Sequence, residues 1–304
     1  MKISRRARIM RRSIASFALG AEASLEERRE AMDRIDRMPR PRKVDYVDTT
    51  VGGVEAIVAT PTRGEPERDI LYLHGGGYII GSPRSHIALA ARLAKRSAAR
   101  VTVIDYRLAP EHPYPAAIED CLAAYRALVE HTDPALVTIA GDSAGGGATL
   151  ATLVALRDAG DTLPACGYLL SPWTDLTASG ESYRSKAIAD PMIDGDMIEA
   201  TAVQYAADTP LDDPGVSPLF ADLHGLPPLL IQTGSEEVLL SDSTDLAERA
   251  TATGVDVQLD VREGMWHVYQ AFAGLMPEAT EALIDAATFI RTHSPAQVPA
   301  ATPA

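Results

Sequence analysis

The chain has 304 residues, of which 46% are hydrophobic and 23% are charged, so it can bury a substantial core. Its formal net charge of −14 argues against nucleic-acid binding, because neutralising phosphates requires a basic surface. Two cysteines, Cys121 and Cys166, are too few for a disulfide framework or a cysteine-rich zinc site. No apolar run approaches the roughly 20 residues that span a bilayer. We therefore expect a cytoplasmic protein without nucleic-acid or membrane partners.

The N-terminal part of the chain differs in charge from the rest. Residues 1–43 hold 13 basic and 6 acidic residues, a net charge of +7, which leaves −21 for the remainder. The run from Arg11 to Ala23, with twin arginines and a short Ala/Ser-rich stretch, faintly resembles a targeting signal. Ser24 and Glu27 form a capping box, and apolar residues recur at helical spacing as far as Ile35. An amphipathic helix is the simpler interpretation, with a targeting arm as its alternative.

From residue 46 onward, runs typical of strands alternate with runs typical of helices. Gly52-Gly53 separates the first two strands, which indicates a hairpin. The later strands are rich in Val, Ile and Leu rather than alternating, as expected of parallel strands covered on both faces. Strands are predicted over residues 46–51, 54–60, 69–74, 101–106, 136–140, 165–170, 229–233 and 255–261, and helices over 85–97, 116–131, 144–158, 196–207, 243–253 and 278–292.

Two segments depart from this alternation. Residues 172–227 are acidic, rich in loops and interrupted by prolines, with one helix expected near 196–207. A connection this long in a compact domain usually has a function, and it could cover a site at the carboxyl ends of the strands. The Pro/Ala-rich residues 294–304 are predicted to be a frayed, flexible tail.

The pentapeptide Gly141-Asp142-Ser143-Ala144-Gly145 fits the G-x-S-x-G pattern between a predicted strand and a predicted helix. Small residues on either side of the serine allow strand and helix to pass closely, which exposes the hydroxyl above the sheet. The Ala144 N–H would lie at the helix N-terminus, where a developing oxyanion is favoured. A glycine-rich helix start with a serine cap is the alternative interpretation, and the strand–turn–helix context favours the nucleophile.

A glycine-rich loop, His74-Gly75-Gly76-Gly77-Tyr78, follows the predicted strand 69–74. Consecutive glycines leave backbone N–H groups accessible, and this pattern matches the loop that supplies oxyanion donors in esterases. A phosphate-binding loop is excluded by the absence of G-x-x-x-x-G-K-[ST]. We expect the N–H groups of Gly75, Gly76 and Ala144 to form an oxyanion hole.

A serine nucleophile needs a general base and a carboxylate that orients it, in the chain order serine, acid, histidine. His267 follows the predicted strand 255–261 at the catalytic end of the sheet, whereas the other histidines precede Ser143 or lie elsewhere. The acid is expected in the loop after strand 229–233. Glu237 is the first choice, Asp242 the alternative that could instead cap the next helix, and Glu236 the third candidate.

Four ordered motifs resemble the bacterial hormone-sensitive-lipase-like carboxylesterases. They are His74-Gly75-Gly76-Gly77-Tyr78, the block from Tyr106 to Ala117, Gly141-Asp142-Ser143-Ala144-Gly145-Gly146 and Gly264-Met265-Trp266-His267. The resemblance spans about residues 45–291 and implies an α/β-hydrolase with a mostly parallel eight-stranded sheet, helices on both faces and a helical cap. It implies residues 1–43 as N-terminal cap helices, 44–171 and 228–293 as the catalytic domain, and 172–227 as the cap insertion. It also implies hydrolysis of short acyl esters without a cofactor, and often a homodimer. A metal enzyme is not expected, since the sequence has no H-E-x-x-H or C-x-x-C motif.

Two details qualify the resemblance. The family usually places Asp in the acid loop, whereas the matching position here is Glu237. Within the block from Tyr106 to Ala117, Arg107 is expected to form an internal ion pair with Glu111 or Asp105.

The resulting hypothesis is a serine carboxylesterase that hydrolyses short-to-medium acyl esters through an acyl-enzyme on Ser143. His267 would be the base, with Glu237 holding its tautomer. A lactone hydrolase with the same triad is the alternative, and a non-catalytic small-molecule receptor on the same fold is a remote one. Side chains expected in the substrate pocket are Tyr78, Asp142, Trp173, Met192 and Met265, each of which could equally belong to the core.

Overall fold

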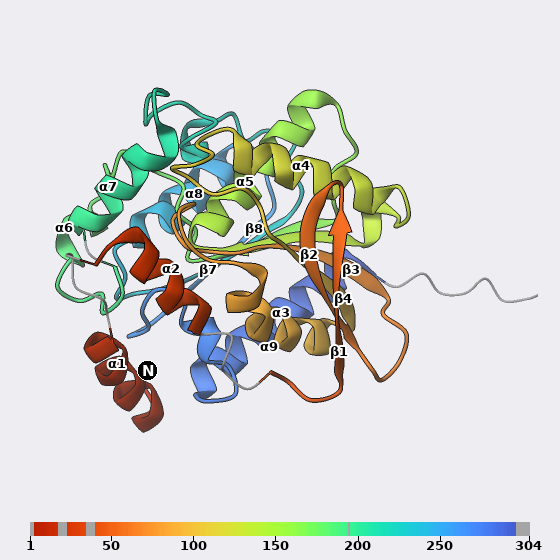
Figure 1. Cartoon of the computed structure of the whole chain (residues 1–304), viewed down its shortest axis with the longest axis horizontal. Helices are drawn as coiled ribbons and strands as arrows, with labels where there is room; N and C mark the ends of the chain where they lie inside the picture. The colour runs from red at the N-terminus through yellow and green to blue at the C-terminus, as the bar shows by residue number, and fades with distance from the viewer. Residues whose placement is uncertain (1–2, 18–22, 35–39, 194, 296–304) are drawn as a thin grey trace, which may run out of the picture.

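The computed structural model describes residues 3–17, 23–34, 40–193 and 195–295, and an eight-stranded sheet runs through it (Figure 1). The strand order is β1-β2-β4-β3-β5-β6-β7-β8. Each predicted strand is present with its ends within two residues of the expected ones. The strands are β1 (Val44–Val51), β2 (Val54–Pro61), β3 (Arg68–Leu73), β4 (Ala99–Ile104), β5 (Val137–Asp142), β6 (Cys166–Leu170), β7 (Leu229–Gly234) and β8 (Val257–Arg262).

The sheet is mostly parallel, as predicted. β1 and β2 form an antiparallel hairpin across Gly52 and Gly53, both at positive φ, and β2 pairs antiparallel with β4. All other pairings are parallel, from β4–β3 to β7–β8. Every residue of β3, β5, β6 and β7 is buried, because helices cover both faces of these central strands. The chain therefore has the predicted α/β-hydrolase fold.

Helices cover the two faces of the sheet. α3 and α9 pack on one face, against β2, β4, β6 and β7, while α5 and α8 pack on the other, against β5 to β8. α4 lies beside α5. The helices are α1 (Arg5–Phe17), α2 (Leu25–Asp33), α3 (Pro83–Ser97), α4 (Ala116–Val129), α5 (Ala144–Ala159), α6 (Ser182–Ser185), α7 (Gly195–Ala206), α8 (Leu240–Ala252) and α9 (Pro277–His293).

Of the two N-terminal helices, one was predicted from the sequence and the other was not. α2 begins at the predicted capping box, in which Ser24 and Glu27 exchange hydrogen bonds; Ile35 lies outside the described residues. α1 was not predicted, and it contains Arg11 to Phe17 of the signal-like run, whose residues 18–22 also lie outside the described residues. Ala7 of α1 is fully buried, and Ser4 donates to Glu278 of α9 through its N–H (2.6 Å) and hydroxyl (3.0 Å).

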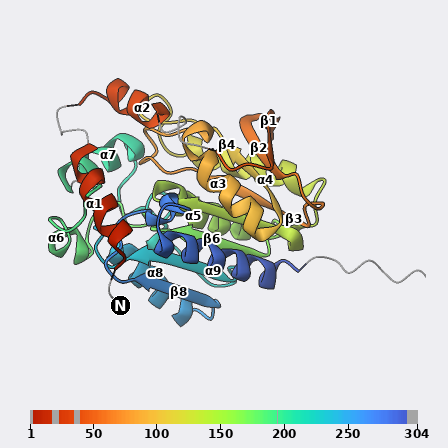
Figure 2. The same cartoon turned by 90° about the horizontal axis from the view of Figure 1, so that it is seen from below.

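The N-terminal helix and the insertion after β6 meet at one end of the molecule. α1, α6 and α7 lie together in both views of the chain, at the end opposite the β1–β2 hairpin (Figures 1 and 2). Arg11 of α1 donates to the carbonyl of Ala189 in the insertion at 2.5 Å. The expected helix near residues 196–207 is present as α7.

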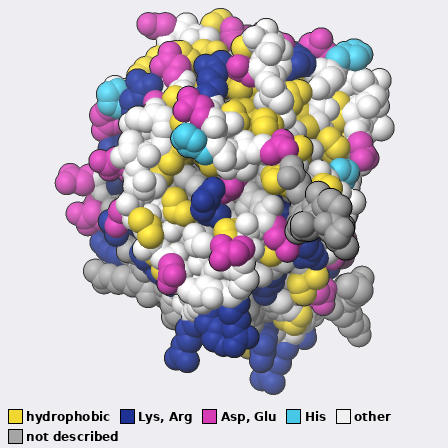
Figure 3. Space-filling model, turned by 90° about the vertical axis from the view of Figure 1, so that its right-hand side faces the viewer, with side chains coloured by type: hydrophobic (Ala, Val, Ile, Leu, Met, Phe, Trp, Pro, Cys, Tyr) yellow, Lys and Arg dark blue, Asp and Glu magenta, His cyan; other side chains and the backbone are white. Residues whose placement is uncertain are grey.

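Surface charge is unevenly distributed, as the sequence predicts. Figure 3 shows acidic side chains scattered over the visible face and a group of arginine and lysine side chains along its lower edge. In the described ranges, no helix is long and apolar enough to cross a membrane.

Candidate active site

Ser143 stands on a sharp turn between β5 and α5. Its backbone has φ 55° and ψ −122°, a strained conformation for a residue with a side chain. Gly141 and Gly145 make the turn possible, because a Cβ on Gly145 would lie 2.0 Å from the carbonyl oxygen of Leu73 and one on Gly141 2.2 Å from that of Gly145. The strand and helix can therefore cross closely enough to lift the hydroxyl clear of the sheet.

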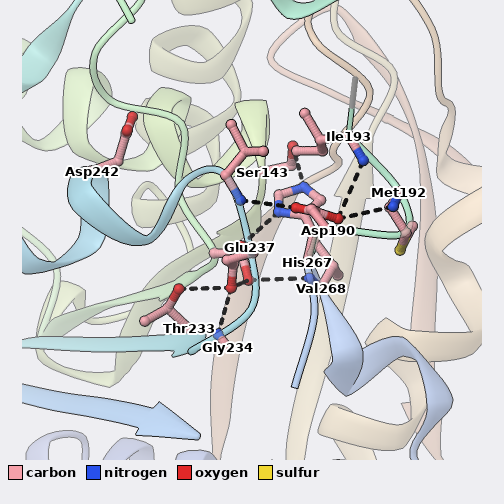
Figure 4. Close-up of polar contacts among 12 residues, drawn as sticks. Ser143, Asp190, Met192, Ile193, Thr233, Gly234, Glu237, Asp242, His267 and Val268 are labelled. Carbon is pink, nitrogen blue, oxygen red and sulfur yellow. Dashed lines mark hydrogen bonds and ion pairs between the residues drawn. The ribbon is translucent and has the colours of Figure 1, made fainter. Parts of the chain in front are cut away.

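His267 and Glu237 complete a hydrogen-bonded chain with Ser143 (Figure 4). His267 Nε2 lies 2.9 Å from Ser143 Oγ, and His267 Nδ1 lies 2.8 Å from Glu237 Oε2. His267 is 5% exposed and Glu237 is fully buried. The three side chains come from the ends of β5, β7 and β8, so the sheet brings together residues that are 124 and 30 positions apart.

The other oxygen of Glu237 is held by donors on two strand ends. Oε1 accepts from the hydroxyls of Ser171 (2.9 Å) and Thr233 (2.7 Å) and from the N–H of Gly234. Ser171 in turn accepts from the N–H of Val268, beside the histidine, at 3.1 Å. Sequence reasoning did not identify Ser171 and Thr233, although both follow or end predicted strands. These bonds fix the carboxylate in one orientation toward the imidazole.

The electrostatics of His267 favour a positive charge on its ring. Burial lowers the pKa of His267, but the hydrogen bond and the negative charge of Glu237 outweigh it and raise the pKa above its ordinary value. An imidazole that gains a proton while a substrate reacts would be stabilised by the same carboxylate.

The structure does not bring Asp242, the alternative acid, to the histidine. Asp242 lies in the first turn of α8 and turns away from His267 in Figure 4. It does not cap that helix; instead it accepts from the N–H groups of Thr174 (2.7 Å) and Asp175 (2.8 Å) in the insertion. Burial raises the pKa of Asp242 to about 8. Glu236 faces Lys186 at 3.7 Å and is not part of the hydrogen-bonded chain.

The glycine loop after β3 offers backbone donors, but not the expected set. Gly75 donates its N–H to Asp142 Oδ1 at 3.3 Å, so its prediction as an oxyanion donor is wrong for this conformation. Within the described part of the chain, the N–H groups of Gly76, Gly77 and Ala144 have no hydrogen-bond acceptor. Gly76 and Gly77 have φ of +124° and +63°, in the left-handed region that favours glycine. These three N–H groups are available to a ligand.

Asp142 lies beneath the glycine loop rather than in a substrate pocket, which corrects its prediction as a pocket residue. Its Oδ1 accepts from Tyr72 at 2.7 Å as well as from Gly75, and its Oδ2 lies 3.4 Å from His86 Nε2. Burial opposes its charge, but the nearby His86 keeps the pKa of Asp142 below its usual value. Asp142 thus anchors the loop to the sheet.

Known proteins resemble this chain closely. The family model of the alpha/beta hydrolase fold matches residues 70–271. An acetyl-hydrolase of Streptomyces hygroscopicus is 42% identical over 88% of this chain and 90% of its own length. An esterase of Acinetobacter venetianus is 41% identical over 72% of this chain and 73% of its own. The crystal structure of an esterase from the bacterial hormone-sensitive lipase family superposes with a TM-score of 0.93, at 40% identity, over 96% and 99% of the two chains.

The chain belongs to the hormone-sensitive-lipase-like bacterial carboxylesterases. It is a carboxylic ester hydrolase, as the motifs predict.

In this esterase the aromatic candidates for the pocket join the glycine loop to the insertion. Tyr78, at φ 62°, stacks on Tyr205 of α7 with ring centroids 3.8 Å apart. A Cβ on Gly77 would lie 2.7 Å from Thr201 of the same helix. Trp173 donates its backbone N–H to the carbonyl of Ser143 at 2.9 Å. Trp173 therefore borders the nucleophile, and Tyr78 connects the glycine loop to α7; both side chains are buried.

The two methionine candidates differ from each other. Met192 is 39% exposed in the turn before α7. Met265 is fully buried with Trp266 in the core cluster that contains residues of α3 and α9, so it supports the sheet and its prediction as a pocket residue is not supported.

The ion pairs of the esterase differ from those expected. Arg107 pairs with Asp120 (2.8 Å) and Glu119 (3.0 Å) of α4 rather than with Glu111. Glu111 instead pairs with Arg29 of α2 at 2.7 Å. The expected partner was chosen by proximity in sequence, whereas helices from other parts of the chain supply the actual partners.

Proposed function

We propose that this esterase hydrolyses short-to-medium acyl esters through an acyl-enzyme on Ser143. The observation that carries the proposal is the unbroken hydrogen-bonded chain Ser143–His267–Glu237, with distances of 2.9 and 2.8 Å. A hydroxyl is a weak nucleophile unless a neighbouring base accepts its proton, and this arrangement supplies that base. The relative from Streptomyces hygroscopicus that is named an acetyl-hydrolase supports a short acyl group.

In the proposed reaction, Ser143 Oγ attacks the ester carbonyl carbon while His267 Nε2 takes the hydroxyl proton. The tetrahedral intermediate collapses, and His267 gives that proton to the departing alcohol. Water then attacks the acyl-enzyme with His267 again as the base, which releases the acid and restores Ser143. Glu237 keeps the Nδ1 proton of the imidazole in place, so that Nε2 is the nitrogen that faces Ser143.

The oxyanion would be held by the N–H groups of Gly76, Gly77 and Ala144. These N–H groups have no hydrogen-bond acceptor within the described residues, which supports this role. An N–H group that already donates to a protein acceptor could not stabilise the negative charge that develops on the substrate oxygen. We further propose that residues 1–43 and 172–227 form the cap over this site. The position of α1, α6 and α7 at one end of the molecule supports that division (Figures 1 and 2).

The test is hydrolysis of a p-nitrophenyl ester series from acetate to laurate by the wild type and by Ser143→Ala. The variant should lose kcat by on the order of 10⁶, because no second nucleophile replaces the serine. A phosphonate should label the wild type at Ser143 and leave Ser143→Ala unlabelled, as determined by mass spectrometry of the intact chain.

The chain-length profile should peak at acetate to hexanoate. Undiminished turnover by a correctly folded Ser143→Ala protein would rule out the acyl-enzyme, and a profile that rises toward laurate would rule out the proposed chain length. Lactone hydrolysis is tested by measuring kcat/KM for a lactone and for the linear esters. A higher kcat/KM for the lactone would favour the lactone hydrolase.

A further inference from the structure

A second buried carboxylate, Asp190, lies next to the proposed triad without belonging to it. Figure 4 shows it beside the ring of His267. It is 8% exposed and ends a short turn of the insertion in which its N–H bonds to the carbonyl of Lys186 at 2.9 Å. A carboxylate in such a position is costly to bury unless donors compensate it.

Both oxygens of Asp190 accept backbone hydrogen bonds from two separate segments. Oδ1 accepts from the N–H groups of Met192 (2.8 Å) and Ile193 (3.3 Å), which shapes the turn before α7. Oδ2 accepts from the N–H of Val238 at 2.9 Å. Val238 directly follows Glu237, so one side chain ties the insertion to the loop that carries the triad acid.

Other contacts hold the same two segments together. Ser182 of α6 donates to the carbonyl of Val238 at 2.5 Å and accepts from the N–H of Ser241 at 2.8 Å. Lys186 faces Glu236 at 3.7 Å, and Arg11 of α1 holds the carbonyl of Ala189. The insertion therefore holds the acid loop on both sides of Glu237, and Asp190 is the contact among these that also lies beside His267.

The charges around His267 come from three segments. Glu237 of the acid loop acts most strongly, followed by Asp190 of the insertion and Asp142 at the end of β5, and all three raise the pKa of the imidazole against the effect of burial. On its other side, Asp190 lines a hollow of about 540 Å³ with Arg8, Arg11 and Arg12 of α1. Burial raises the pKa of Asp190, while His267 and the N–H donors favour its anion.

We propose that Asp190 is a positioning residue for the ester hydrolysis, which fixes the acid loop through Val238 and adds a second negative charge behind His267. This inference rests on the proposed triad. It makes the insertion part of the catalytic apparatus rather than only a cover, because a side chain of the insertion holds the backbone of the loop that carries Glu237.

The test is the pH profile of kcat/KM for Asp190→Asn and Asp190→Glu. Asp190→Asn removes the negative charge. It also places either an amide NH₂ or a neutral carbonyl oxygen opposite the N–H of Val238, so the hydrogen bond to Val238 is lost or weakened. We expect kcat to fall by on the order of tenfold to a hundredfold. The acid limb of the profile is the pH range in which kcat/KM falls as His267 becomes protonated. It should also move to lower pH, because neutral His267 is the base and the loss of a nearby anion favours the neutral form. Asp190→Glu keeps the charge, so its acid limb should stay at the wild-type pH while kcat falls.

Asp175→Asn is the matched control. Asp175 is a 2% exposed carboxylate of the same insertion that accepts hydrogen bonds from Thr177 (2.9 Å) and Ser179 (3.0 Å), and it is not among the charges acting on His267. Its replacement should lower the melting temperature without moving the acid limb. A limb that moves equally in both variants would mean that any disturbance of the insertion shifts it.

The outcomes separate the two proposals. Loss of phosphonate labelling at Ser143 in the wild type would defeat the triad itself, whatever Asp190 does. An active wild type together with an Asp190→Asn protein of unchanged limb and kcat would overturn the role of Asp190 alone. If Asp190→Asn does not fold, Asp190→Glu decides, since a shifted limb or an unchanged kcat in that variant contradicts the proposal.

Discussion

At the scale of single residues, the choice between two buried carboxylates is the sharpest question. Glu237 accepts from His267, Ser171, Thr233 and Gly234, whereas Asp242 accepts from backbone N–H groups of the insertion. Both are buried to within 1% of full coverage, so burial alone does not distinguish them. Only the direction of their hydrogen bonds does.

Glu237→Gln should lower kcat by on the order of 10⁴, because the amide can no longer hold the imidazole in its productive tautomer. Asp242→Asn should leave kcat within a factor of about 3. Steady-state hydrolysis of a p-nitrophenyl ester checks both, with Glu236→Gln, a half-buried neighbour outside the hydrogen-bonded chain, as the control. The opposite ranking of the two variants would transfer the role of triad acid to Asp242.

The raised pKa of Asp242 also predicts a loss of stability as pH rises toward 8. Burial raises its pKa to about 8 in the folded protein, so folding favours the protonated carboxyl. The stabilisation is present below the unfolded pKa of Asp and is lost as pH rises through about 8. The loss therefore develops between the unfolded pKa of about 4 and the folded pKa of about 8, so the melting temperature of the wild type should decline over that range and show no further loss from Asp242 above it.

Asp242→Asn should remove this decline. An asparagine is neutral at every pH, and its carbonyl oxygen can accept the same two N–H bonds from Thr174 and Asp175. Differential scanning calorimetry from about pH 4 to about pH 9 measures the effect. Parallel curves for wild type and variant over this range would show that another group causes the loss of stability.

Some residue roles could be predicted from the sequence and others could not. Ser143, His267 and Glu237 follow from local motifs and from chain order, and the structure places them within hydrogen-bonding distance. Gly75 and Asp142 were misjudged because both face each other, a contact that depends on how β3 and β5 pair. Asp190 has no motif, since its relation to His267 exists only once the insertion folds back on the acid loop.

At the scale of elements, a single arginine attaches α2 to the loop beyond the glycines. Arg29 donates to the carbonyls of Ile79 (2.9 Å) and Ala109 (3.1 Å) and pairs with both oxygens of Glu111 (2.7 and 2.8 Å). The side chains of Arg29 and Glu111 are 31% and 53% exposed, so solvent weakens their ion pair.

Arg29→Ala should cost about 1–2 kcal/mol of unfolding free energy, because the two carbonyls lose their donor. Glu111→Gln should cost less than about 1 kcal/mol, because it removes only the exposed ion pair. Urea unfolding followed by circular dichroism compares the variants. Equal costs would mean that the ion pair, and not the carbonyl contacts, attaches the helix.

Strands were easier to predict than the N-terminal helix. The buried strands consist of short apolar runs between turn signals, and this pattern can be recognised in the sequence without knowledge of the tertiary contacts. They are β3, β5, β6 and β7. Apolar residues recur at helical spacing from just before α1 into the helix, at Ile3, Ala7, Met10 and Ile14. Arginines nevertheless dominate the composition of α1. Its helical structure depends on packing against the core cluster of α3 and α9, which no local pattern reveals.

At the scale of the whole molecule, the basic N-terminal residues belong to the folded protein. α1 buries Ala7 completely and holds the carbonyl of Ala189, while α2 is attached through Arg29. Deleting residues 1–43 should therefore lower the melting temperature by at least about 4 °C, which corresponds to roughly 2 kcal/mol for a chain of this size.

The same deletion should lower kcat/KM, because Ala189 adjoins the carboxylate that braces the acid loop. Calorimetry and ester hydrolysis on the purified truncated chain measure both effects. A truncated protein with the melting temperature and activity of the full chain would restore the interpretation of these residues as a targeting arm.

The stack of Tyr78 on Tyr205 has a consequence for protein engineering. The two ring centroids lie 3.8 Å apart and connect the loop that holds the proposed oxyanion donors with α7 of the insertion. Transplanting the insertion of a relative to change substrate preference would exchange Tyr205 and Thr201 while leaving Tyr78 and Gly77 behind. A chimaera that keeps these pairs matched should retain turnover, whereas one that ignores them would alter selectivity and catalytic rate together.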